Sequence, residues 1–121
     1  MELELFNEIS VEIDGQPFFS VENYHTYAVR QIRLVESFGQ ANAAGIAAGP
    51  PHYQVELSRV RRSGEEDLYA LSDFSVVISR LQSRTVYTGC EWESIEEKTE
   101  TDGAVTETIR LTALNRMELP A

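Results

Sequence analysis

The chain has 121 residues, of which 42% are apolar, which suffices for one hydrophobic core but not for two. Its 20 acidic and 10 basic residues give a formal net charge of −10, which argues against specific nucleic-acid binding by the surface as a whole. A single cysteine excludes an internal disulfide framework, and no apolar run is long enough to insert into a membrane. The acidic N-terminus, unlike that of a signal peptide, favours the cytoplasm.

The first predicted element covers residues 3–13, where apolar and polar residues alternate. A period of two is typical of a strand with one buried face. Phe6 and Asn7 break the alternation, so one long strand and two short strands both fit. Asp14-Gly15 follows and predicts a tight turn, because glycine tolerates the positive φ that such turns require.

Residues 24–36 predict a second strand, with a bulge or bend near Arg30 and Gln31 where the apolar parity changes. Residues 37–51 (SFGQANAAGIAAGPP) contain three glycines and end in two prolines, which disfavours a helix. We interpret 37–51 as an adaptable loop within a single domain that covers residues 1–121. Its small residues suit close approach to a neighbouring backbone but not a core of their own, so we expect the loop to be disordered in the monomer and ordered between subunits.

The third strand begins at Tyr53 and ends in the basic run 59–62. Ser63 and Glu66 have the spacing of a capping box, which predicts a short helix over residues 64–72. Strands are then predicted from Phe74, over 84–98 and over 104–117, the last two joined by a hairpin turn at Asp102-Gly103.

On the first arm of that hairpin, Val86, Cys90 and Trp92 share a parity and are expected on the core side. The complete pattern predicts a mainly β chain with one short α-helix. We expect an antiparallel β-sandwich or a partly closed barrel of six to seven strands.

Side chains with catalytic or ligating potential are few. His25, His52 and Cys90 form no motif for metal binding or nucleophilic catalysis. His52 reads as a surface residue at a strand start, and Cys90 reads as a small core residue beside Trp92. The paired glutamates at 91/93 and 96/97 lie in a hairpin that reads as exposed, whereas acid–base catalysis needs a carboxyl group with a raised pKa. We therefore expect no enzyme activity, no cofactor and no resident metal.

The charges are segregated along the chain. Residues 1–22 hold six acids and no base, and residues 91–107 hold seven acids and one lysine, whereas arginines gather at 30–33, 59–62 and 80–84. One interpretation is that these are solvated faces with ion pairs inside the monomer. The other is that acidic and basic surfaces on different faces meet between copies.

The C-terminal half, with DFSVVISR followed by TVYTGCEWESIEEKTETDGAVTETIRLTAL, resembles the tail tube proteins of phages and of contractile injection particles. The matching positions are Tyr87, Gly89, Cys90 and Trp92 in one strand and Ile109, Leu111 and Ala113 in the closing arm. The resemblance covers about the last 50 residues, and the rest agrees in element order.

The resemblance implies a structural subunit that forms stacked, hexameric rings around a lumen for DNA or another cargo. Its implied partners are further copies of itself and other tail, sheath or baseplate proteins, in a virion or tail-like particle assembled in the host cytoplasm. A tube initiator, a terminator, a baseplate component and a non-catalytic small-ligand β-barrel are the alternatives.

Two groups of residues are predicted to serve assembly. Candidates for the subunit interface lie in the loop and in the basic run; they are Phe38, Ile46, Arg59, Arg61 and Arg62. Candidates for an acidic lumen or stacking surface lie in the C-terminal hairpin; they are Glu93, Glu96, Glu97, Glu100 and Asp102.

Overall fold

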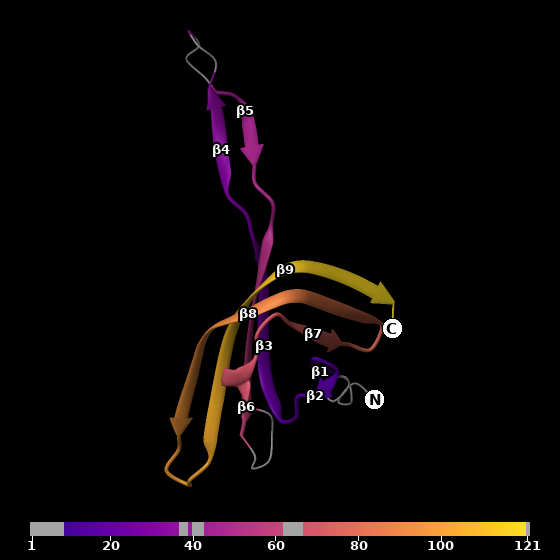
Figure 1. The fold of residues 1–121 in the computed structure, drawn as a ribbon, viewed down its shortest axis with the longest axis vertical. Coiled ribbons are helices and arrows are strands. Elements are labelled where there is room, and N and C mark those ends of the chain that lie inside the picture. The colour runs from indigo at the N-terminus through magenta and orange to yellow at the C-terminus, as the bar shows by residue number, and fades with distance from the viewer. Residues whose placement is uncertain (1–8, 37–38, 40–42, 62–66, 121) are drawn as a thin grey trace.

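The computed structural model describes residues 9–36, 39, 43–61 and 67–120. Nine strands account for most of them, and Figure 1 shows their arrangement. They are β1 (Ser10–Ile13), β2 (Gln16–Pro17), β3 (Val21–Val29), β4 (Ile32–Glu36), β5 (Ala43–Ala48), β6 (His52–Val60), β7 (Phe74–Ser79), β8 (Ser83–Thr99) and β9 (Val105–Pro120). The single described helix is a 3-10 turn, η2 (Leu68–Ala70).

Seven of the strands form one antiparallel sheet in the order β2-β1-β7-β8-β9-β6-β3, while β4 and β5 pair only with each other. The two long strands β8 and β9 run through both halves of this sheet. In one half, the first part of β8 pairs with β7, and β7 pairs with β1. In the other half, the first part of β9 pairs with β6, and β6 pairs with β3. Strands β8 and β9 pair with each other throughout. Figure 1 shows β8 and β9 arching from one half to the other.

Gly89 has φ +66°, and the pairing of β8 with β7 becomes irregular around it, between Val76 and Phe74; we call this point the corner. A Cβ atom at this position would lie 3.2 Å from Cβ of Leu114 on β9, so the corner needs glycine both for its backbone angle and for its space. The pairing register of β8 and β9 is unbroken across Gly89 and shifts farther along, between Trp92 and Ser94. These irregularities let one ribbon of two strands serve two differently oriented halves of the sheet.

Both halves bury their inner faces in one core. β7 contributes Val76 and Ile78, and β6 contributes Val55 and Leu57, all without exposed surface. These side chains belong to a single cluster, so the sheet folds over on itself without closing into a barrel. The prediction of a mainly β, antiparallel, sandwich-like chain is confirmed.

The predicted turns are also present. Asp14 and Gly15 both have positive φ, 51° and 79°, in the tight turn between β1 and β2. The strand predicted over 24–36 is divided into β3 and β4 by Arg30 and Gln31, where the change of parity predicted a bulge or bend. Gly103 takes φ +89° in the turn that joins β8 to β9.

Three expectations need correction. Part of the segment predicted as a loop, Ala43–Ala48, is strand β5, which pairs with β4 to form a hairpin (the arm). Its backbone hydrogen bonds to β4 hold an extended structure despite the small side chains. The remaining residues 37–38 and 40–42 lie outside the described residues.

The second correction concerns the predicted helix over 64–72. Its predicted cap, Ser63 with Glu66, lies outside the described residues, and the described part forms only η2, with Asp67 accepting from the Tyr69 N–H at 3.0 Å. The third concerns β8, where Tyr87 rather than Val86 is buried together with Cys90. The positive φ of Gly89 breaks the period of two between these residues.

Candidate assembly surfaces

The arm projects away from the rest of the chain, as Figure 1 shows. The register pairs Leu34 with Ile46 and Ile32 with Ala48, which places these four side chains on one face. Ile32, Leu34 and Ile46 are 62%, 61% and 67% exposed, although all three are large and apolar. An isolated two-stranded hairpin is at best marginally stable in water, so this face is suited to burial against another surface.

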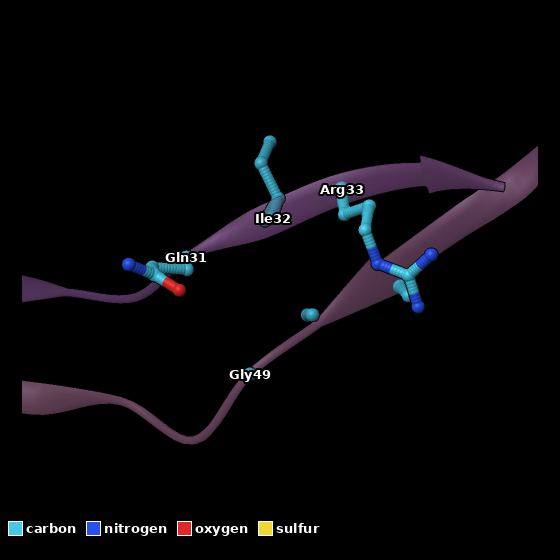
Figure 2. Close-up of a pocket in the computed structure, with 6 residues that line it drawn as sticks. Gln31, Ile32, Arg33 and Gly49 are labelled. Atoms are coloured by element: carbon cyan, nitrogen blue, oxygen red, sulfur yellow. The ribbon is translucent and has the colours of Figure 1, made fainter.

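The other face of the arm has a different chemistry. Arg33 pairs in register with Ala47, and Val35 with Gly45, so a long basic side chain faces small ones. Figure 2 shows Ile32 and Arg33 pointing to opposite sides of β4, beside an open hollow that Gln31 and Gly49 also line. The Gly49 N–H donates to the Gln31 carbonyl at 2.8 Å and closes the base of the arm. Neither Arg30 nor Arg33 has an ion pair with another described residue.

Among the predicted interface residues, Ile46 is therefore on the arm and exposed, whereas Phe38 and Arg62 lie outside the described residues. Arg59 is inside the chain: its side chain is 3% exposed, and its guanidinium contacts Glu107 at 2.9 Å. The same guanidinium lies 4.4 Å above the ring centre of Phe18. The interpretation of Arg59 as a surface residue is wrong, because this strand position faces the core.

Arg61 is half exposed and is bound within the chain. It contacts Glu97 at 2.9 Å and Glu107 at 3.8 Å. These pairs bring the basic segment 59–61 onto the acidic segment 91–107 of the same copy. The expectation that these two segments lie on different faces is wrong, and the interpretation as ion pairs inside the monomer holds for them.

The predicted acidic residues all lie at the exposed hairpin end of β8 and β9. Glu93, Glu96 and Glu97 are on β8, and Glu100 and Asp102 are in or beside the turn. Glu97 pairs with Arg61, and Glu100 lies 4.0 Å from the exposed Lys98. Asp102 accepts a hydrogen bond from the Ala104 N–H at 3.0 Å, which stabilises the turn. The structure thus groups these acids at one end of the molecule.

One face of the sheet is polar across four strands. Its centre is rich in hydroxyls, with Ser58 and Thr108 hydrogen-bonded at 3.0 Å between β6 and β9. Beside them Arg110 donates to Glu56 at 2.8 Å. On β3 the register continues this face with His25 and Tyr27, and on β8 it continues with Ser94, Glu96 and Lys98. This face suits contact with water rather than with a second layer of protein.

The sheet also has open edges. Pairing of β6 with β9 ends at Tyr53 and Ala113, whereas β8 accompanies β9 to Pro120. Residues Leu114–Pro120 therefore have one edge without a partner among the described strands. The hairpin end of β8, past Cys90, is open on its outer side in the same way. Strand β3 pairs with β6 along one edge and has no partner among the described strands along the other. Sequence reasoning did not find these edges, because pairing order is a property of topology.

The titratable side chains with catalytic potential are dispersed. Cys90 is fully buried, its thiol contacts the Tyr87 carbonyl at 3.6 Å, and burial raises its pKa to about 12. It is the core residue that the sequence indicated. His25 lies on the polar face and His52 at the start of β6. The part of the chain that is described contains no group of three or more metal-ligating side chains, and no helix in it is long and apolar enough to cross a membrane.

No protein-family model and no curated protein matches the chain. Its fold is nevertheless similar to solved structures over nearly its whole length. The structure of the sheath-tube complex of the PVC extracellular contractile injection system superposes with a TM-score of 0.69 at 9% identity, covering 94% of this chain and 89% of that chain. The SPP1 tail tube gives a TM-score of 0.64 at 14% identity, with coverages of 94% and 77%.

Two further structures extend the comparison. The tube-terminating cap of the anti-feeding prophage gives a TM-score of 0.61 at 12% identity, covering 94% of this chain and 89% of that chain. Hcp1 from Flavobacterium johnsoniae gives 0.55 at 14% identity, with coverages of 93% and 95%. The chain has the fold of the tube proteins of phage tails and tail-like injection particles.

Proposed function

We propose that this protein is a structural, non-catalytic subunit of the tube of a phage tail or tail-like particle. In this proposal, six copies form a ring, rings stack, and DNA or another cargo passes through the lumen. The particle is assembled in the host cytoplasm, where the subunit associates with other tail, sheath or baseplate proteins. The observation that supports this most is the likeness in fold to tube proteins over 94% of the chain.

The surfaces fit this role. The polar face that includes Ser58, Thr108 and Arg110 suits the wall of a water-filled lumen, because it offers hydrogen bonds without an adhesive apolar patch. The formal charge of −10 per copy repels phosphate, which keeps DNA from sticking to the wall. The open edges of β3 and β8 provide backbone groups through which neighbouring sheets can join into a ring.

Assembly in solution tests the proposal. We expect the purified protein to form rings with about six times the 13.6 kDa mass of the chain, visible by negative-stain electron microscopy with a central hole. A chain that remains monomeric at high concentration would contradict the proposal and favour a small-ligand domain. Replacing His25 and His52 by asparagine is expected to leave assembly intact, since neither side chain is assigned a catalytic role.

A tube terminator is the second candidate function. The similarity to the anti-feeding prophage cap, with a TM-score of 0.61, favours it almost as strongly as the similarity to the SPP1 tube. A main tube subunit forms long tubes by itself, whereas a terminator stops at one or two rings. The length distribution of assemblies in electron micrographs distinguishes these two roles.

A further inference from the structure

The open edge of β9 can accept another strand. From Leu114 to Pro120 it has seven residues in extended conformation with one side unpaired among the described strands. Leu114 and Met117 are 67% and 58% exposed on this segment. An edge that combines free backbone groups with apolar side chains is a site for β-augmentation, in which a strand from another molecule continues the sheet.

The arm supplies a strand of fitting length. Strand β4 has five residues, pairs with β5 on one side, and is open on the other among the described strands. Its residues alternate between the apolar Ile32 and Leu34 on one face and Arg33 on the other. Within one chain, the arm and the end of β9 point in different directions, as Figure 1 shows, so β4 does not reach the β9 edge of its own chain. The donor of the strand is therefore a second copy.

We propose that strand β4 of one copy adds antiparallel to the β9 edge of a second copy, in the register that sets Arg33 opposite Glu118. This inference rests on the proposed self-assembly and names the two surfaces that meet. The resulting pairs are Ile32 with Leu119, Arg33 with Glu118, Leu34 with Met117 and Val35 with Arg116. Apolar side chains meet apolar ones on one face, and on the other face Arg33 meets the opposite charge of Glu118 while Val35 lies beside the aliphatic stem of Arg116.

Competing registers are worse. Parallel pairing of Leu34 with Met117 sets Arg33 opposite Arg116, and so does the antiparallel register shifted by two residues toward the start of β9. The antiparallel register shifted by two residues toward the end of β9 places Ile32 beyond Pro120, where the strand ends, so Ile32 has no opposing residue in β9. A shift by one residue exchanges the faces and separates the apolar pairs. Arg116 already pairs with Glu118 at 2.8 Å, so an opposing Arg33 joins a carboxylate that is held in place.

The proposed register also continues an apolar row that exists in the sheet. Val77 pairs with Val86, and Val86 pairs with Met117. Within the arm, Leu34 pairs with Ile46. Joining Met117 to Leu34 of the second copy makes one cross-strand row over five strands, in which each apolar side chain has an apolar neighbour.

Disulfide trapping tests the register. A Leu34→Cys chain is mixed with a size-tagged Met117→Cys chain, allowed to assemble and oxidised mildly. Both positions are exposed, so the substitutions leave the core intact, and the buried Cys90 is the same in every sample. Directly opposed strand residues approach disulfide distance, so we expect a mixed dimer at a yield about ten times that of the control pair Arg33→Cys with Met117→Cys, whose side chains point to opposite faces.

The outcomes separate the two proposals. Rings in the micrographs with a strong 34–117 crosslink support the augmentation. Rings without that crosslink, or with an equal yield from the control pair, overturn the augmentation and leave the tube assignment standing. A protein that remains monomeric at every concentration overturns both.

A charge swap tests the same register independently. Arg33→Glu is expected to weaken assembly, and the double variant Arg33→Glu with Glu118→Lys is expected to restore part of the assembly. If Arg33 only stabilised its own arm, the change at Glu118 would restore nothing.

Discussion

The buried ion pair between Arg59 on β6 and Glu107 on β9 permits a quantitative test of what holds these two strands together. The two side chains are 3% and 4% exposed and approach to 2.9 Å. Replacement of Arg59 by methionine keeps most of the side-chain volume but removes the guanidinium. Glu107 then remains buried with Arg61, at 3.8 Å, as its one nearby cation among the described residues.

The magnitude follows from the burial of Glu107. Removing one partner of a buried pair typically costs about 3–5 kcal/mol, because the remaining charge is left without compensation. The half-exposed Arg61 offsets part of this, so we expect a cost near the lower end, about 3 kcal/mol. Loss of the stacking on Phe18 contributes to this total. For a chain of this size such a loss corresponds to a decrease in Tm of roughly 10 °C.

The assay is chemical denaturation at a concentration where the chain is monomeric. Arg110→Met is the matched control, because Arg110 pairs with Glu56 at 2.8 Å between the same two strands but on the exposed face. It is expected to cost much less stability than Arg59→Met, because solvent screens the exposed pair. The double variant Arg59→Met with Glu107→Leu is expected to return close to wild-type stability. Equal costs for Arg59→Met and Arg110→Met, or no recovery in the double variant, would refute the reasoning.

Four further predictions concern the core, the corner, the arm and the charges. Because burial raises the pKa of Cys90 to about 12, native protein is expected not to react with a thiol reagent between pH 7 and 9; rapid native labelling would contradict this. The unfolded thiol ionises near pH 8.5, so this residue lowers the free energy of unfolding by roughly 1.4 kcal/mol per pH unit above that value, a slope that a Cys90→Ala variant is expected to lack. Gly89→Ala is expected to lower the free energy of unfolding by about 2 kcal/mol and Gly15→Ala by about 1 kcal/mol, as measured by denaturant titration. Both glycines have positive φ, but a Cβ atom meets Leu114 only at Gly89, so equal costs would refute the steric requirement for glycine at the corner. Ile46→Asp is expected to abolish assembly in light scattering without changing monomer stability, whereas Ala47→Asp on the other face is the milder control; similar losses would exclude a role for the apolar face. Assembly is expected to weaken as salt is raised to 1 M, through screening of exposed pairs, and a salt-independent assembly would exclude charge as a contributor.

Local pattern predicted much of the fold. The alternation of apolar and polar residues located most of the strands, and Asp14-Gly15 and Asp102-Gly103 located two turns, because these signals depend on neighbours in sequence. The arm was not predicted. Ala43–Ala48 has little apolar contrast, so the pairing of β5 with β4 provides the order that the side chains do not indicate.

The candidate site was harder to predict, for a related reason. Arg59 and Arg61 appeared to be surface charges because no local pattern indicates that β6 pairs with β9. In the structure this pairing sets Glu107 directly opposite Arg59. The open edge at Leu114–Pro120 is likewise invisible in sequence, since it exists only because β6 leaves β9 at Ala113. Residues 1–8 and 62–66, which hold many of the charges considered, lie outside the described residues.

The position of β9 in the sheet has a consequence for biosynthesis. β9 comes last in chain order among the described strands, lies between β8 and β6, and connects the β3–β6 pair to the strands β1, β7 and β8. Before β9 emerges from the ribosome, the described strands of this sheet form two groups with no pairing between them, and neither group can enclose the core that contains Ile109 and Leu111. The sheet, and with it the β9 edge from which a neighbour can be recruited, is therefore completed only once β9 has been synthesised.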